Sequence, residues 1–194
     1  PAAHVIAGGN SSLALMHLVV RTALDKGLWQ DERAWAKADA PTLITPVPGY
    51  DRHFTLTAAL GINMLNVEMT DEGPNMDQVS SLIADDPNIK GIWNVPKYSN
   101  PTGCTYSDAT VAQIAALPNN AAADDFVVLW DNAYAVHDLE FPGAKLASIY
   151  DASVALGTQD HVAQFASTSK VTFAGAGIAF IGSGPAVLES LEKE

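Results

Sequence analysis

The sequence of 194 residues lacks what several common classes of protein need. Cys104 is its one cysteine, so an internal disulfide is impossible, a cysteine-based metal site is disfavoured, and the reducing cytoplasm is the expected location. Ten basic residues stand against 22 acidic ones, and the formal net charge of −12 argues against binding of nucleic acid or anionic membrane by this segment. No apolar run is long enough to predict a membrane-spanning helix.

Two further absences concern metals and the chain ends. The five histidines are scattered and show no spacing typical of a metal site. No secretory signal opens the chain, which begins at Pro1 without a methionine and stops at Glu194 within residues typical of a helix. We therefore expect one domain, residues 1–194, that is a segment of a longer polypeptide.

Short apolar runs alternate with segments of helical periodicity along the whole chain, and hydrophobic residues make up 48% of it. This pattern predicts an α/β fold, a three-layer αβα sandwich around a mainly parallel sheet of seven strands. Strands are expected at residues 3–7, 42–46, 63–69, 91–95, 126–131, 162–166 and 177–181. Helices are expected at residues 11–25, 51–60, 76–84, 108–117, 146–155 and 186–191, and the remaining segments, Asn119 and Asn120 among them, are expected to be loops.

Polar motifs follow several of the expected strands. Asn10 follows the first strand, Asn100 the fourth and Lys170 the sixth, while Asp131 ends the fifth. Ligands of open α/β sheets gather at the carboxyl ends of the strands, so these residues are expected to form one site.

Lys170 and Asp131 carry the most chemistry. A lysine can form a Schiff base with an aldehyde if its surroundings let it lose a proton near neutral pH, although a lysine after Ser167-Thr168-Ser169 would in isolation be read as a solvated surface residue. Asp131 ends the most apolar strand, where an unpaired carboxylate is costly, so it needs a cationic partner. A protonated pyridine nitrogen would supply one; a cap at the strand end is the simpler interpretation.

The other motifs offer hydrogen-bond donors. Tyr134 and Asn100 could converge on a ring oxygen, although Asn100-Pro101-Thr102-Gly103 alone is equally typical of a β-turn. The run from Gly8 to Ser12 opens a helix, where free backbone N–H groups and hydroxyls favour a phosphate, and Ser167 and Ser169 could add two more hydroxyls.

Together, VPKYSNPTG, DNAY and STSKVTFAGAG resemble fold-type I enzymes that use pyridoxal 5′-phosphate (PLP), namely the class I and II aminotransferases. The likeness extends from about residue 7 to 184 and is greatest to the aspartate-aminotransferase-like branch related to MocR-type proteins. It implies that Lys170 is the Schiff-base lysine and general base and that Asp131 meets the pyridine nitrogen. It places Asn100 and Tyr134 at the ring hydroxyl. The residues implied around the phosphate are Asn10, Ser11, Ser12 and Ser167, with Ser169 as a further candidate.

The resemblance implies an aminotransferase that exchanges an amino group between an amino acid, with aspartate or glutamate as candidates, and a 2-oxo acid. It also implies a homodimer, and a PLP-binding large domain whose N-terminal segment and small C-terminal domain lie outside these residues. Two alternatives stay open: the PLP-binding effector domain of a MocR-like transcriptional regulator, and a PLP-dependent lyase or decarboxylase.

The sequence departs from the family pattern at two places. Ile178 stands eight residues after Lys170, where most members have a phosphate-binding arginine. Val47 stands where many members stack an aromatic ring on the cofactor, so Tyr50 or His53 is expected to take that part. Lys97 and Arg52 are equally compatible with anion contacts and with solvated charges.

Overall fold

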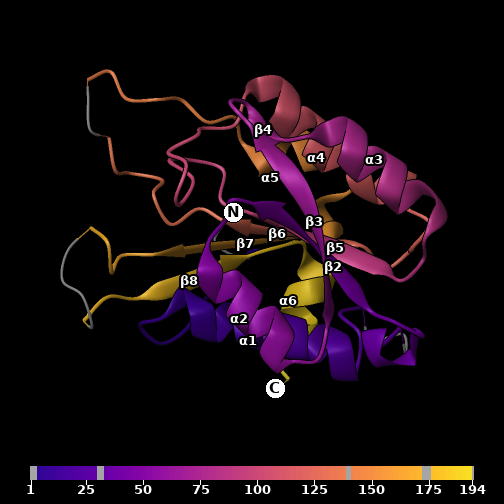
Figure 1. The fold of residues 1–194 in the computed structure, drawn as a ribbon. Coiled ribbons are helices and arrows are strands. Elements are labelled where there is room, and N and C mark those ends of the chain that lie inside the picture. Colours follow the sequence, from indigo (N-terminus) through magenta and orange to yellow (C-terminus); the bar gives the residue numbers. More distant parts are fainter. Residues whose placement is uncertain (1–3, 30–32, 139–140, 172–175, 194) are drawn as a thin grey trace.

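The computed structural model describes residues 4–29, 33–138, 141–171 and 176–193. One mixed sheet of eight strands, in the order β1-β8-β7-β6-β5-β2-β3-β4, crosses the molecule (Figure 1). Strands β3, β2, β5, β6 and β7 are mutually parallel, and β8 runs against β7. The strands are β1 (Val5–Ala7), β2 (Thr42–Val47), β3 (Asn63–Thr70), β4 (Gly73–Pro74), β5 (Ile89–Asn94), β6 (Val127–Asp131), β7 (Val162–Ser167) and β8 (Ala179–Gly182).

The predicted α/β class and mainly parallel sheet are confirmed, but the count of seven strands is wrong. The additional strand is β4, which pairs antiparallel with Met69 and Thr70 at the end of β3. A strand of two residues cannot show an alternating pattern, so no periodic signal predicts it. The other strands match their predicted positions within about two residues; Ala3, in the first predicted strand, lies outside the described residues.

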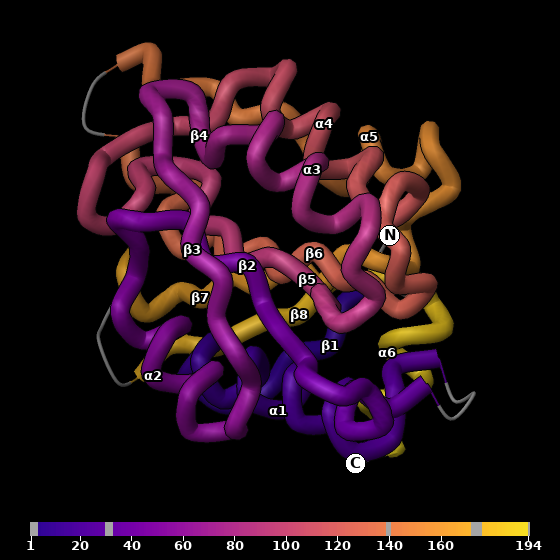
Figure 2. The backbone as a smooth tube through the Cα atoms, turned by 45° about the vertical axis from the view of Figure 1, so that its right-hand side comes forward, coloured from indigo at the N-terminus to yellow at the C-terminus, as the bar shows by residue number. Residues whose placement is uncertain are grey.

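Helices cover both faces of the sheet, and Figures 1 and 2 show α1, α2 and α6 on one face and α3, α4 and α5 on the other. They are α1 (Ser12–Asp25), α2 (Asp51–Ala59), α3 (Met76–Asp85), α4 (Asp108–Asn120), α5 (Ile149–Leu156) and α6 (Pro185–Leu191), with short 3₁₀ turns η2 (Trp35–Lys37) and η3 (Gln159–His161). Two predicted boundaries are wrong. Helix α4 continues through Asn119 and Asn120, and α5 begins only after Ser148, whose side chain accepts a bond from the Asp151 N–H.

Strand β6 lies at the centre of both apolar cores. All five of its residues are buried. Val127 and Leu129 pack into the core beneath α1, whereas Val128 and Trp130 pack into the core beneath α3 and α4. Alternate side chains of a strand point to opposite faces, so a strand covered by helices on both faces is apolar along its whole length. Ligands can therefore reach such a strand only at its ends.

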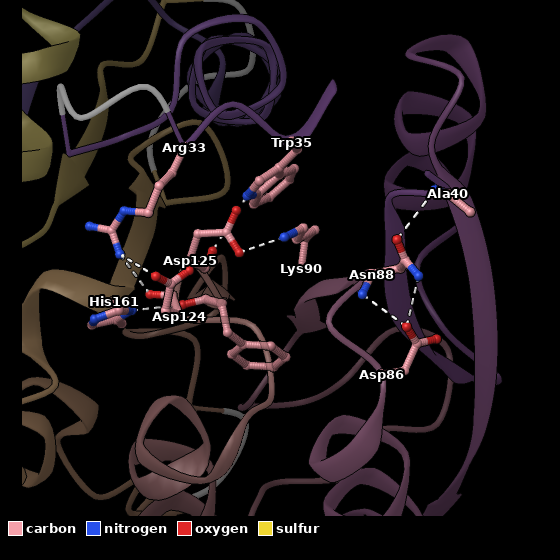
Figure 3. A network of polar contacts seen from close by, with 10 residues as sticks. Arg33, Trp35, Ala40, Asp86, Asn88, Lys90, Asp124, Asp125 and His161 are labelled. Carbon is pink, nitrogen blue, oxygen red and sulfur yellow. Dashed lines mark hydrogen bonds and ion pairs between the residues drawn. The ribbon is translucent and has the colours of Figure 1, made fainter. Parts of the chain in front are cut away.

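At the amino edge of the sheet the polar groups pair with one another, as Figure 3 shows. Lys90 Nζ lies 2.7 Å from Asp125 Oδ1, and both side chains are nearly buried. Trp35 Nε1 donates to the carbonyl of Asp125 at 3.4 Å, and Arg33 Nη1 donates to the carbonyl of Asp124 at 3.1 Å. His161 Nδ1 donates to the carbonyl of Phe126 at 2.9 Å. These contacts tie β5, β6 and the segment before η2 together.

None of the helices in the described ranges has the length and apolar character needed to cross a bilayer.

Candidate active site

A cavity of about 140 Å³ lies at the carboxyl edge of the sheet. Segments that follow β1, β2, β5, β6 and β7 contribute to it. β1 joins this edge because β1 and β7 both run against β8, so both point the same way. All nine predicted site residues line the cavity, together with Leu13, Tyr50, Val95 and Ala133: they are Asn10, Ser11, Ser12, Asn100, Asp131, Tyr134, Ser167, Ser169 and Lys170. The structure thus brings the separate motifs together in one place.

Asp131 is the buried acid of the cavity, with 3% of its surface exposed. His53 Nε2, on α2, donates a hydrogen bond to Asp131 Oδ2 at 3.1 Å. The other carboxylate oxygen, Oδ1, is buried and has no hydrogen-bond partner among the described residues. A buried carboxylate oxygen without a donor is costly, so this atom favours a ligand that brings a donor or a positive charge.

His53 is held in place from behind. Its ring stacks on Trp93 with 4.2 Å between centroids and 11° between planes. Trp93 Nε1 donates to Thr57 Oγ1 at 2.9 Å, and Thr57 Oγ1 donates to the carbonyl of His53 at 2.8 Å. The sequence predicts His53 only as a ring-stacking candidate and does not indicate its contact with Asp131. The available signal was its place one helical turn before Thr57, which puts both residues on the buried face of α2.

Lys170 and two tyrosines face the cavity. Lys170 Nζ donates to Tyr134 Oη at 3.5 Å and lies 5.2 Å from the centroid of the Tyr134 ring. Burial raises the pKa of the Tyr50 phenol; the nearby Lys170 opposes this shift and Asp131 reinforces it. Because that pKa is raised from its ordinary value of about 10, Tyr50 is a neutral phenol at physiological pH. A primary amine, a phenol that can bond to it and a neutral aromatic ring therefore share one cavity.

The serine-rich side of the cavity joins the start of α1 to the end of β7. Ser169 Oγ donates to the carbonyl of Asn10 at 3.0 Å, and Ser169 N–H donates to Ser167 Oγ at 3.3 Å. Gly177 permits this close approach, because a Cβ there would lie 2.7 Å from Ser169 Oγ.

The cap of α1 differs from the caps of α3, α4 and α5. In those three helices the side chain of the N-cap residue, Asn75, Ser107 or Ser148, accepts a backbone hydrogen bond. Ser11, the N-cap residue of α1, makes no such side-chain bond in the described structure. Its hydroxyl and the first turn of the helix are therefore suited to an anion.

Asn100 lies in a closed turn after β5. The Ser99 N–H donates to the carbonyl of Cys104 at 2.8 Å, and the Gly103 N–H donates to the carbonyl of Ser99 at 2.6 Å. Gly103 has φ of +77°, which glycine adopts without strain. A turn is present at the motif, but its bond joins Gly103 to Ser99, four residues earlier, and not to Asn100 as in a β-turn of these four residues; Asn100 lines the cavity.

Other candidates lie elsewhere. Val47 and Ile178 do not line this cavity, whereas Tyr50 does. Arg52 is exposed and lies 4.0 Å from Asp51 Oδ1. The expectation that Lys97 is solvated or free to bind an anion is wrong, because it is 5% exposed and pairs with Asp138. Over the described ranges, no three His, Cys, Asp or Glu residues gather as a metal site would need.

Known proteins resemble this chain in sequence and in fold. Residues 1–194 match the family described as aspartate amino-transferase. An aspartate aminotransferase of Corynebacterium glutamicum is 42% identical over 182 residues, which are 93% of this chain and 41% of that protein. The crystal structure of an aspartate transaminase from C. glutamicum superposes with a TM-score of 0.92 at 39% identity, over 97% of this chain and 44% of that one.

A more distant structure shows how widely the fold is shared. LysN, an α-aminoadipate aminotransferase of Thermus thermophilus, superposes with a TM-score of 0.77 at 23% identity, over 98% of this chain and 44% of that chain. The chain spans about two fifths of the length of the curated relatives it matches. With the family match over all 194 residues and relatives above 40% identity, the chain belongs to the aspartate aminotransferase family of fold-type I proteins.

Proposed function

We propose that this chain forms the cofactor-binding part of a PLP-dependent aminotransferase. The observation that carries the proposal is the half-satisfied carboxylate of Asp131: one oxygen is bonded to His53, and the other is buried without a partner in a cavity that also holds Lys170. A pyridine nitrogen that carries a proton matches this oxygen in both charge and hydrogen bonding. LysN was crystallised with a phosphopyridoxyl compound, which agrees with such a ligand.

When bound, PLP supplies an aldehyde for a lysine amine and an electron sink for bonds at the substrate α-carbon. Lys170 would hold the cofactor covalently through Nζ and later take up and return the proton of the substrate α-carbon. Asp131 would keep the proton on the pyridine nitrogen, and His53 would keep Asp131 oriented. Asn100 and Tyr134 would donate to the ring hydroxyl, and Tyr50, which lines the cavity, would pack its ring on the cofactor.

The phosphate would lie at the start of α1. It would be bound there by backbone N–H groups of the first turn of α1 and by side chains that line the cavity. The arginine that most family members use is absent, because Ile178 stands at its position. The side chains that we assign to the phosphate are Asn10, Ser11, Ser12, Ser167 and Ser169. Lys170 is the only cationic side chain among the described residues that line the cavity, so hydroxyls and amides would provide most of the binding.

The substrates that we propose are an amino acid, with aspartate as the first candidate, and a 2-oxo acid. Relatives described as aspartate aminotransferases support this choice over a regulator's effector domain. We also propose that residues 1–194 are the large domain of a longer cytoplasmic homodimer. Light scattering of the full-length protein would test its dimeric state.

Substitution of Lys170 tests the assignment directly. In the full-length protein, Lys170→Ala should abolish the visible absorbance that covalently bound PLP produces, whereas Lys193→Ala, at an exposed lysine after α6, should leave it intact. Survival of the band in Lys170→Ala would overturn the assignment. Incubation of the wild-type holoenzyme with a panel of amino acids should convert PLP to its pyridoxamine form. Failure with every amino acid would favour a lyase or a regulator.

A further inference from the structure

The loop after β6 carries Tyr134, and it is fastened at two points outside the cavity. Lys97, which follows β5, donates through Nζ to Asp138 Oδ1 at 2.7 Å and to the carbonyl of Ala135 at 3.1 Å. His137 Nε2 donates to the backbone carbonyl of Lys170 at 2.6 Å. The first contact fixes the loop to the segment that leads into Asn100. The second fixes it to the backbone of the reactive lysine.

The first fastening is built at some cost. The side chain of Lys97 is 6% exposed, and an ammonium removed from water to that extent needs close partners. Tyr98 Oη also donates to Asp138 Oδ1, at 3.3 Å. The Lys97 hydrogen bond holds the pKa of the Asp138 carboxyl below its ordinary value, so this carboxyl is ionised at neutral pH. A Cβ at Gly143 would lie 2.0 Å from Asp138 Cγ, so glycine there leaves the carboxylate its place.

The second fastening lies directly beside the reacting groups. The rings of His137 and Tyr134 meet edge to face, with 5.9 Å between centroids. A carbonyl can only accept a hydrogen bond, so His137 Nε2 carries the proton in this contact. One imidazole therefore touches Tyr134 with its ring and Lys170 with its N–H. The distance of 3.5 Å between Tyr134 Oη and Lys170 Nζ depends on where this loop lies.

We propose that Lys97 and His137 are positioning residues. They act through Tyr134 and keep its hydroxyl beside Lys170, in the cavity that Asn100 also lines. This proposal rests on the proposed function in one respect only, the identity of the ligand that Tyr134 and Lys170 would bind. Three sequence motifs that are distant along the chain are thereby linked by contacts outside the cavity. Neither residue lines this cavity, and Lys97 instead lines a separate cavity together with Asn132 and Ala135.

Lys90 offers a matched control for Lys97. Like Lys97, Lys90 is nearly buried and has an aspartate oxygen 2.7 Å from its Nζ. Lys90 lies at the amino end of β5, however, whereas Lys97 follows the carboxyl end of this strand. In the full-length apoprotein, Lys97→Met should increase hydrogen–deuterium exchange in residues 132–138, and Lys97→Arg should restore protection. Lys90→Met should not raise exchange in that loop above its effect elsewhere. Unchanged exchange in Lys97→Met would overturn the fastening itself, whether or not the protein binds PLP.

A double-mutant cycle tests the role of Tyr134. Lys97→Met and His137→Phe should each weaken PLP binding about fivefold, a size common for residues in contact, and the loss should vanish when Tyr134 is already replaced by Phe. His137→Gln, which keeps a donor, should recover part of the affinity. Equal losses with and without the Tyr134 hydroxyl would contradict positioning through Tyr134. If the wild-type protein bound no PLP, the proposed function would fail while the exchange result still decided the fastening.

Discussion

The two ends of strand β6 present the same residue type in two conditions. Asp125 lies just before the strand and Asp131 ends it, and each is 3% exposed. At the amino end, the Lys90 ammonium lies 2.7 Å from Asp125 Oδ1 and supplies a full positive charge. At the carboxyl end, His53 serves one oxygen of Asp131, and the other has no partner in the described structure. The protein completes one end itself, and the other end matches the ligand that we propose.

This difference separates stability from function within one strand. Breaking a buried ion pair leaves a charge without compensation, which is strongly unfavourable. A carboxylate kept half-satisfied costs free energy in the absence of ligand, because its desolvation is not repaid. We therefore expect substitutions at the amino end to lower stability, and substitutions at the carboxyl end to lower activity with little loss of stability.

The largest effect is expected at the amino end. Lys90→Met removes the ammonium but leaves Asp125 buried and charged, so the free energy of unfolding should fall by about 3–5 kcal/mol. Urea denaturation of the full-length apoprotein measures this loss. Turnover per folded molecule should stay at the wild-type level. Adding Asp125→Asn should recover part of the stability, and a loss below about 1 kcal/mol in the single variant would contradict the contrast between the two ends.

Asp131→Asn is expected to have the next largest effect, at the opposite end. It keeps the shape of the side chain but removes the charge that would hold a proton on the ligand. We expect turnover of the full-length holoenzyme to fall on the order of 10²- to 10³-fold, as when a preorganised electrostatic group is removed. The melting temperature of the apoprotein should stay equal or rise. A matching Asp125→Asn variant should reverse the pattern, with a lower melting temperature and normal turnover.

The sequence predicted the carboxyl end of β6 better than the amino end. Asp131, Lys170 and Asn100 belong to short motifs at strand exits, and parallel strands bring their exits to one edge, so the predicted residues meet in one cavity. The pairing of Lys90 with Asp125 joins residues 35 positions apart by register between neighbouring strands. No local pattern records such a register, so the network at the amino edge could not be predicted.

Contacts that depend on tertiary packing also explain why the supports of the site residues could not be predicted. His53 lies 78 residues before Asp131, and its contact depends on how α2 packs over β5 and β6. From the sequence, Lys97 is equally compatible with an anion contact and with a solvated charge; its observed partner, Asp138, comes from a loop without periodicity. Motifs thus predicted which residues line the cavity. Their supports depend on tertiary packing that composition and spacing do not encode.

The smallest effect is expected at the rim of the carboxyl edge, where Cys104 follows the Asn100 turn. Burial raises the pKa of its thiol, the charge of Asp71 adds to the shift, and Sγ donates to the carbonyl of Asp71 at 3.2 Å. A raised pKa leaves less of the reactive thiolate at a given pH, so the rate of alkylation by iodoacetamide should rise with pH through a midpoint above the ordinary value of about 8.5.

The same shift affects stability. The folded protein binds the thiol proton more tightly than the unfolded chain does, so the contribution of the thiol to stability is complete below the pKa of the unfolded chain and is lost as pH rises through the pKa of the folded protein. Alkylation rates measured from pH 7 to 10, in native buffer and in guanidinium chloride, test this shift. Equal midpoints in the two solvents would contradict the raised pKa, and with it the burial of the Cys104 thiol beside the Asn100 turn.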